Sequence, residues 1–286
     1  MYRNIAFSGG GAHTLAFVGA IKYLEETKHI ENVRNIIGAS GGSFFALLLL
    51  LNWSYDRIRA YCTTNLVKHL ERDIVSITSL VKLPYHYGLN DGQVLIDIVE
   101  DVLAKSGVDK NATFMDLAKT FGKHIVIATT NVTQKRIEYL SVDTEPEMKV
   151  STAIRMSTSI PILFTPVKYY DDLYVDSLIY NNFPIDFFQQ FTVDTLGINI
   201  NVLEKRERPR NFFAYMSTIY NCLYDSVMQK RVGGLRSDCK ICNVDIDESI
   251  KKFDMYHMRF SVTPALVNEL QDKGYAALSR AFDEVR

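Results

Sequence analysis

A serine between two glycines is the first feature of this chain whose residue types and spacing could support chemistry. The segment GASGG at 38–42 has the pattern G-x-S-x-G and lies between an apolar strand-like run and an apolar helix-like run. In that context a serine occupies a sharp strand-to-helix turn with its hydroxyl exposed. Gly38 and Gly42 lack a Cβ atom, so strand and helix can approach closely, and the dipole of the following helix favours negative charge at Ser40. The pattern predicts Ser40 as a nucleophile on an elbow.

Three consecutive glycines near the start of the chain form a second motif. They follow a short apolar run and precede a helical pattern. A Walker loop is excluded because no Gly-Lys-Ser/Thr follows, and Thr14 replaces the last glycine of a dinucleotide fingerprint. Nucleotide binding remains an alternative on this loop alone, but loop amides can equally approach the oxyanion of a tetrahedral intermediate. The amides that we expect to bind this oxyanion are those of Gly9, Gly10, Gly11 and Ala12.

A serine hydroxyl needs a base, and the chain offers two kinds. A triad in the order Ser40, Asp176, His257 would match one known chain order. Against it, only one strand precedes the elbow strand, and His257 lies in MYHMRF without a clear orienting carboxylate. The other base is Asp176 alone, at the end of the apolar run LYVD, although an aspartate there could also simply form a turn.

The elements that must position these residues alternate between strand and helix. Apolar spacing predicts a strand at 2–8, a helix at 12–28, a strand at 32–40 and an apolar helix from 41, an order that implies parallel strands with right-handed crossovers. Further strands are expected at 123–132, 136–141, 173–184 and 193–201, and further helices at 54–83, 93–105, 151–161 and in the C-terminal tail.

Composition excludes several classes of protein. The 286 residues are 47% hydrophobic and 23% charged, with a formal net charge of −1, so no positive field favours nucleic acid. The longest apolar run, at 44–51, has eight residues, far fewer than the roughly 20 of a membrane span. We expect no signal peptide, a cytoplasmic location and reduced cysteines; the single C-x-x-C at 239–242 lacks the partners of a zinc site.

Four segments, taken together, resemble a known family. SGGGA, GASGG, STSIPILFTPV and YVDSLIYNNFP occur here in the order seen in patatin-like phospholipases. The resemblance covers residues 4–200 as a patatin-like catalytic domain, with 201–286 as a C-terminal extension packed on the same domain. It implies a three-layer α/β/α fold with a mostly parallel central sheet.

The resemblance also implies a reaction. Ser40 would be the nucleophile and Asp176 the base of a Ser-Asp dyad that hydrolyses acyl esters of phospholipids or related lipids through an acyl-serine, with no metal or other cofactor. The lipid substrate would be met at a membrane surface by peripheral contact. Because an aspartate with a pKa near 3.9 is a poor base at neutral pH, we expect a desolvated site that raises this pKa.

Three positions depart from the family pattern. His13 and Thr14 stand where the family usually has arginine and glycine, and Ser177 stands where it has glycine after the catalytic aspartate. If position 177 required φ > 0, serine would be strained by roughly 1–3 kcal/mol. These departures leave a second hypothesis open, namely a catalytically weak or inactive lipid-binding protein with the same fold.

Overall fold

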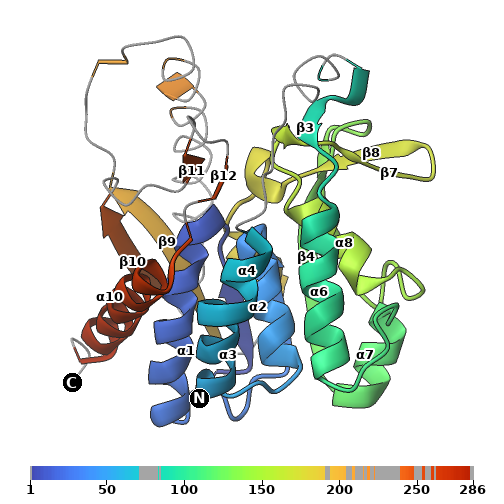
Figure 1. Ribbon diagram of the computed structural model, residues 1–286. Helices are drawn as coiled ribbons and strands as arrows, with labels where there is room; N and C mark the ends of the chain where they lie inside the picture. Colours follow the sequence, from blue (N-terminus) through green and yellow to red (C-terminus); the bar gives the residue numbers. More distant parts are fainter. Residues whose placement is uncertain are drawn as a thin grey trace.

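A computed structural model describes residues 2–70, 83, 85–190, 194–203, 239–247, 253–254, 259–260 and 262–283, together with residues 208, 209, 215, 218, 219 and 222. Within these ranges the central sheet has eight strands in the order β10-β9-β1-β2-β4-β8-β7, with β5 also paired to β4 (Figure 1). The strands are β1 (Asn4–Phe7), β2 (Asn35–Ala39), β4 (His124–Asn131), β5 (Arg136–Leu140), β7 (Val167–Tyr169), β8 (Asp172–Val175), β9 (Thr195–Leu203) and β10 (Cys239–Asp247).

The directions of the strands confirm the predicted mostly parallel sheet. β10, β9, β1, β2 and β4 run parallel to one another, whereas β5 and β8 run antiparallel to β4 and β7 runs antiparallel to β8. β1 is buried along its whole length, as expected for a central parallel strand; Ile5, Ala6 and Phe7 are apolar, and the amide of the buried Asn4 side chain donates to Thr195 Oγ1 (3.1 Å).

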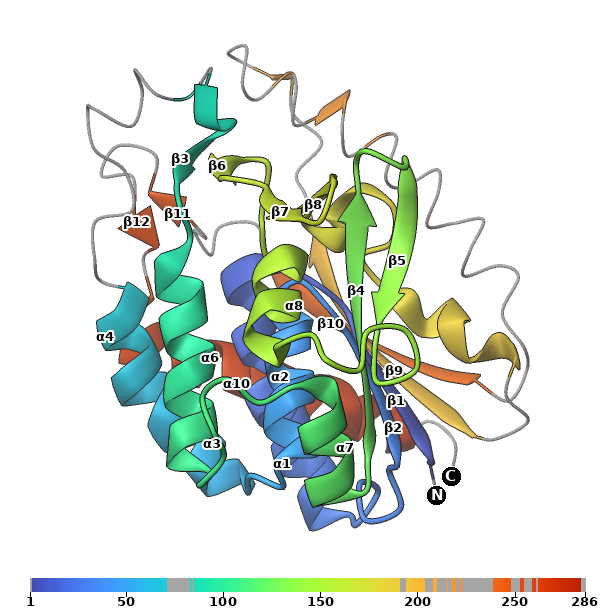
Figure 2. The same ribbon diagram turned by 90° about the vertical axis from the view of Figure 1, so that its right-hand side faces the viewer.

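Helices cover one face of the sheet more heavily than the other (Figure 2). The helices are η1 (Gly11–Ala16), α1 (Phe17–Glu26), α2 (Gly41–Leu50), α3 (Tyr55–Tyr61), α4 (Val67–Leu70), α6 (Gln93–Lys105), α7 (Phe114–Phe121), α8 (Val150–Ser157) and α10 (Pro264–Asp283). On the opposite face, η4 (Pro184–Gln190) lies against the sheet, with Ile185 and Phe188 buried beside Ile37. The predicted three layers are therefore present but unequal.

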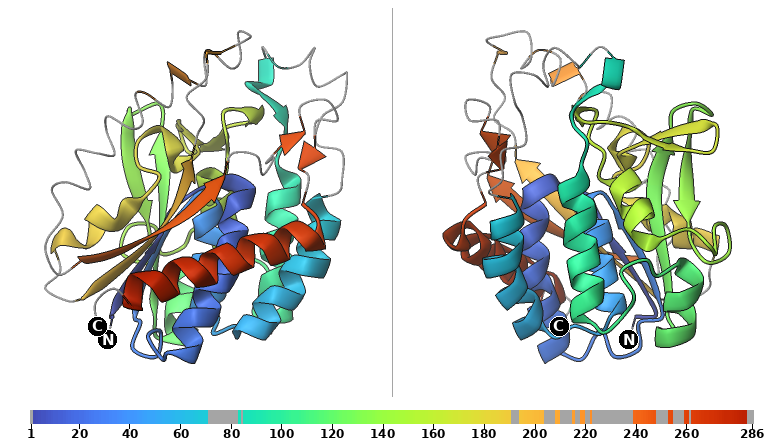
Figure 3. Two further views of the ribbon diagram at one scale, coloured as in Figure 1. Left: turned by 90° about the vertical axis from the view of Figure 1, so that its left-hand side faces the viewer. Right: turned by 45° about the vertical axis from the view of Figure 1, so that its right-hand side comes forward.

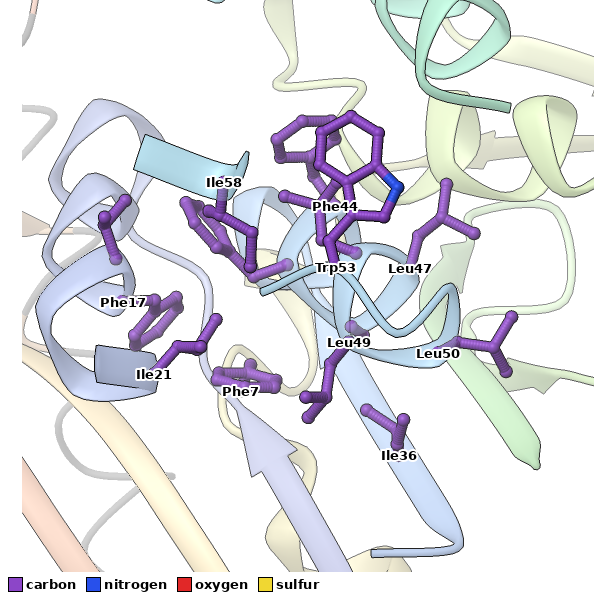
Figure 4. Packing of buried hydrophobic residues seen from close by; sticks show 14 of the residues in the cluster. Phe7, Phe17, Ile21, Ile36, Phe44, Leu47, Leu49, Leu50, Trp53 and Ile58 are labelled. Atoms are coloured by element: carbon purple, nitrogen blue, oxygen red, sulfur yellow. The ribbon is translucent and has the colours of Figure 1, made fainter. Parts of the chain in front are cut away.

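Helix α2 is at the centre of the larger core. Its apolar side chains pack on β1, β2 and β4 and against α8, and the rings of Phe45 and Phe44 contact Phe17 of α1 and Tyr61 of α3. Figure 4 shows Phe44 beside Trp53, with Leu47 and Leu50 on the side of α2 that faces away from α1. Fully burying one such side chain stabilises the fold by about 1.5–3 kcal/mol. A helix that is apolar all round must be buried all round, and this rigid position fixes the N-terminus that follows Ser40.

The C-terminal part adds a strand and a helix to the same body. β10 pairs with β9 along its full length, and α10 packs on α1 (Figure 3). The two helices approach so closely that a Cβ on Gly19 would lie 1.8 Å from the carbonyl oxygen of Gln271. β9 continues to Leu203, three residues past residue 200, the end of the catalytic domain predicted from the sequence. The division into a catalytic domain and a C-terminal extension stays a prediction.

Some elements differ from their predicted form. The expected helix at 54–83 is divided into α3, a π-helical turn at Cys62–Leu66 and α4, and most of its remainder lies outside the described residues. Two short strands that apolar spacing does not predict, β3 (Gly88–Asn90) and β6 (Ile162–Phe164), pair in parallel as a separate ribbon. Three-residue strands are too short to show a period of two.

Candidate active site

The predicted nucleophile and base lie where two strands converge on one edge of β4. β2 pairs with β4 as far as Ala128, and β8 pairs with it from Thr130 onward. β5 pairs with β4 beside both stretches, so it must occupy the opposite edge. Because β2 runs parallel and β8 antiparallel to β4, their C-terminal ends face each other across Thr129. This arrangement brings together Ser40 and Asp176, which are 136 positions apart.

Ser40 has the backbone of a nucleophile elbow. Its φ of 50° and ψ of −129° are unfavourable for a residue with a side chain, at roughly 1–3 kcal/mol. Its N–H donates to Ser157 Oγ (2.8 Å), which in turn donates to the carbonyl oxygen of Ala128 (2.6 Å). The strained residue is therefore fixed from α2, α8 and β4 together.

The two elbow glycines allow two different close approaches. A Cβ on Gly38 would lie 2.5 Å from Cα of Ser43, where strand and helix meet. A Cβ on Gly42 would lie 2.3 Å from the carbonyl oxygen of Ser8, where α2 crosses the end of β1. Both contacts are with backbone atoms, which cannot be moved by a change of side-chain rotamer. Neither position could therefore hold a side chain without a shift of the backbone.

The hydroxyl of Ser40 donates a hydrogen bond to Oδ2 of Asp176 over 2.7 Å. Oδ1 of the same carboxyl accepts from the amide of Leu178 (2.9 Å), and the amide of Asp176 donates to the carbonyl oxygen of Ser159 (3.0 Å). Complete burial raises the pKa of Asp176 to about 7, although its hydrogen bonds with Leu178 and Ser40 act in the opposite direction. The desolvated environment expected for a neutral-pH base is thus present at this carboxyl.

The glycine loop lies beside the elbow. Gly9 donates its N–H to the carbonyl oxygen of Asn182 (2.8 Å), and a Cβ there would lie 2.9 Å from Cβ of Ser40. The amide of Gly9 is therefore engaged, and its small size is what brings the loop up to Ser40. Gly11 has a φ of 55°, and a Cβ on it would meet nothing within 4 Å, so this part of the loop faces open space. Together with Ala12 it borders the cavity at Ser40.

An apolar cavity of about 120 Å³ begins at Ser40. The glycine loop and the start of α2 form its polar end. Side chains of α2, α4, α6, α8 and the ribbon form its apolar wall, including Phe44, Leu66, Leu70, Leu95, Ile98 and Phe164. A wall of this composition suits a hydrocarbon chain and offers few polar partners to a nucleotide.

The departures from the family pattern cause no clash at the site. Ser177 does not have a positive φ; it begins a short 3-10 helix at Ser177–Ile179. Its buried hydroxyl has no hydrogen bond of ordinary geometry, yet it lies close enough to lower the pKa of Asp176. Thr14 is buried, and its hydroxyl donates to the carbonyl oxygen of Gly11 (2.7 Å), which helps to hold the loop. His13 is also buried.

Several supporting residues are not evident from the sequence. Ser157 Oγ accepts from the amide of Ser40 and the carbonyl oxygen of Ser159 accepts from the amide of Asp176, yet two serines at the end of a predicted helix give no signal of such contacts. Arg155 is 3% exposed, and burial lowers its pKa to about 10, so it stays charged at neutral pH. The alternative base His257 lies outside the described residues.

The described residues contain neither a candidate membrane span nor a candidate metal cluster. None of their helices is long and apolar enough to cross a membrane. No group of three or more histidine, cysteine, aspartate or glutamate side chains in this part of the chain could hold a metal ion, and Cys239 and Cys242 lie in β10.

Comparison with known families agrees with this geometry. The family model described as patatin-like phospholipase matches residues 5–188, which include the glycine loop, the elbow and Asp176. The chain belongs to the patatin-like phospholipase family.

Relatives of this patatin-like chain include viral proteins. It is 30% identical over 230 residues to an uncharacterized protein, R571, of Acanthamoeba polyphaga mimivirus, covering 76% of this chain and 74% of that protein. It is 26% identical over 190 residues to the probable lipid hydrolase 463L of Invertebrate iridescent virus 6, covering 65% and 62%.

Solved structures share the patatin-like fold. VipD from Legionella pneumophila aligns with a TM-score of 0.57 at 17% identity, over 99% of this chain and 67% of that one. The type III effector protein ExoU of Pseudomonas aeruginosa aligns with a TM-score of 0.53 at 13% identity, over 99% of this chain and 53% of that one. At these identities the likeness concerns the fold.

Proposed function

We propose that this chain is a serine hydrolase of lipid acyl esters that uses Ser40 and Asp176 as a dyad and forms an acyl-serine. The observation that carries the proposal is the 2.7 Å hydrogen bond from Ser40 Oγ to a buried Asp176, at one end of an apolar cavity. Family membership and the probable lipid hydrolase among its relatives support the same substrate class.

Acylation begins with proton transfer from Ser40 to Asp176 as Oγ bonds to the carbonyl carbon of the ester. The amides of Gly10, Gly11 and Ala12, together with the dipole of α2, stabilise the resulting oxyanion; one such donor is worth about 100- to 1,000-fold in rate. The intermediate collapses as its bond to the alcohol oxygen breaks, and the protonated Asp176 returns its proton to that oxygen. The acyl chain remains on Ser40 with its tail in the cavity.

Deacylation repeats these steps with water. Asp176 accepts a proton from the water as its oxygen bonds to the acyl carbon, and the same amides stabilise the second oxyanion. The bond to Oγ then breaks, the fatty acid leaves, and Asp176 returns the proton to Ser40. Because the base must be ionised, kcat/KM should rise with pH through about 7 and level off above it, as a pH-rate profile would show.

The decisive experiment labels the nucleophile and measures turnover together. Mass spectrometry should find a fluorophosphonate adduct on Ser40, and Ser40→Ala and Asp176→Asn should each reduce release of fatty acid by at least about 10,000-fold. Asp172→Asn is the matched control, because this carboxylate lies four residues earlier, at the start of β8, and should leave turnover nearly intact. Full activity in Asp176→Asn would exclude the dyad.

The same experiment separates the second hypothesis. Binding to liposomes without an adduct and without turnover would identify a non-catalytic lipid-binding protein. The backbone at Ser177 gives that hypothesis no support, since this residue does not have a positive φ; the replacement of glycine by Thr14 is its other motivation.

A further inference from the structure

Large apolar side chains project into solvent at one end of the molecule. Tyr85, Tyr87, Ile162 and Tyr170 are 80%, 65%, 60% and 79% exposed, and we call these four residues the apolar rim. Tyr85 and Tyr87 precede β3, Ile162 begins β6, and Tyr170 links β7 to β8. Figures 1 and 2 place the ribbon β3–β6 and the hairpin β7–β8 at the same end of the molecule, where the parallel strands have their C-terminal ends and where β8 pairs with the last residues of β4.

Three members of the rim have a left-handed backbone. The φ angles of Tyr87, Ile162 and Tyr170 are 59°, 73° and 51°. A residue with a side chain pays roughly 1–2 kcal/mol for this conformation, and a β-branched residue there is a genuine outlier. Glycine or asparagine would adopt it more readily. Since the exposed side chains bury little within the chain, folding alone does not account for these residue types.

The rim stands on a fixed scaffold. Ile162 pairs with Gly88, and the amide of Thr165 donates to the carbonyl oxygen of Asn90 (2.8 Å). Nη2 of Arg155 donates to the carbonyl oxygens of Asp91 (2.7 Å) and Thr165 (2.9 Å), which attaches both strands of the ribbon to α8. The direction in which the rim faces is therefore set before any partner arrives.

The same ribbon also forms part of the cavity wall. Phe164, two residues after Ile162, is 1% exposed and lines the cavity that begins at Ser40, as does Leu95 in the helix that follows β3. A lipid surface in contact with the rim would thus lie beside the apolar cavity that begins at Ser40.

Charge and side-chain chemistry favour one kind of surface. Among the residues that the structure describes beside the rim, the exposed charged side chains are Lys168, Asp91 and Asp171, a sum of −1 with His86 neutral, which gives no attraction to an anionic layer. Tyrosine has an apolar ring and a polar hydroxyl, a combination suited to the boundary between headgroups and acyl chains.

We infer that the apolar rim docks on the surface of a zwitterionic phospholipid bilayer and holds the cavity of Ser40 against it. The inference rests on the proposed function, because docking on a bilayer is useful to the chain only if its substrate is a lipid. Docking itself does not require turnover. It can therefore be measured in a Ser40→Ala background, where failure of docking and failure of catalysis give separate results.

The experiment compares flotation with phosphatidylcholine vesicles. In the Ser40→Ala background, the combined change Tyr87→Asn, Ile162→Asn and Tyr170→Asn should lower the vesicle partition coefficient at least about tenfold, through lost apolar area. Asparagine suits a left-handed backbone, so the unfolding temperature should stay equal or rise. Lys28→Asn is the matched control: it makes the same backbone change at an exposed residue with a φ of 60°, in the connection after α1, and should leave partition unchanged.

Three outcomes would overturn the inference. Equal partition of the rim variant and its parent would show that the rim is not the contact. Binding confined to vesicles with phosphatidylserine and abolished by 0.5 M salt would show that charge drives association. Self-association in light scattering that the rim variant loses, with no vesicle binding by its parent, would identify the rim as an interface between two copies of this chain.

Discussion

The elbow and the apolar rim both contain left-handed residues with side chains, but their surroundings are opposite. Ser40 is 4% exposed, and its amide and hydroxyl are held by Ser157 and Asp176. Ile162 is 60% exposed, with a larger and β-branched side chain. Inside the fold, neighbouring atoms impose the strained backbone and the strain aims a nucleophile. At the surface, residues with a positive φ instead carry exposed apolar side chains, and the inferred partner of these side chains is a bilayer and not another part of the chain.

The largest loss of stability is expected where a side chain is added at one of the close contacts of the elbow. Gly42→Ala would place a Cβ 2.3 Å from the carbonyl oxygen of Ser8, and we expect a loss of about 3 kcal/mol or more in the free energy of unfolding. Gly11→Ala, which has a left-handed φ but open space around it, should lose only about 1 kcal/mol. Denaturant titrations of the two variants measure this difference, and equal losses would show that packing does not dominate at the elbow.

The base should show a stability effect that changes with pH. Burial raises the pKa of Asp176 above its unfolded value, so the folded chain binds the proton more tightly and loses stability as pH rises from about 4 to about 7. Asp176→Asn does not titrate there. Its free energy of unfolding should exceed that of the parent by on the order of 4 kcal/mol at pH 8 and by almost nothing at pH 4.

Asp172→Asn serves as the control of opposite sign for this measurement. Hydrogen bonds from Asn131 and Gln134 lower the pKa of the Asp172 carboxyl, so its removal should slightly destabilise the chain at pH 8. If Asp176→Asn behaved in the same way, the carboxyl would not be the desolvated base described above.

The rim should show the smallest effect. Tyr170→Asn should raise the free energy of unfolding by about 1 kcal/mol, because asparagine tolerates the left-handed backbone and little buried area is lost. Tyr85→Asn makes the same side-chain change at a residue without a positive φ and should be neutral. A destabilised Tyr170→Asn would mean that the tyrosine contributes packing, as its ring contact with Tyr169 allows, and would remove the contrast with the elbow.

The parts of the molecule that the sequence predicts are those with local causes. The elbow and the β-α-β-α opening follow from glycines and apolar periods within about 50 residues, and the predicted sheet is confirmed. The prediction that Ser40 pairs with Asp176 depends instead on the resemblance to the family, because the spacing of two residues 136 positions apart does not by itself indicate a contact.

Other features depend on contacts that no single segment encodes. The role of Arg155 arises from the carbonyl groups of Asp91 and Thr165, which directly follow β3 and β6, and the ribbon itself consists of two three-residue strands. The engagement of the Gly9 amide by Asn182 likewise follows from how the loop after β8 folds back. A left-handed φ at Ile162 contradicts its residue preference and could not be expected from sequence.

The head-on meeting of β2 and β8 has a consequence for how this architecture can diversify. Thr129 is the residue of β4 that lies between the two strand ends, and β4 itself belongs to the chain that connects Ser40 to Asp176. Loops or helices could be inserted before or after β4 in that connection without altering the distance between hydroxyl and carboxylate. One extra residue in β4 beside Thr129 would separate them.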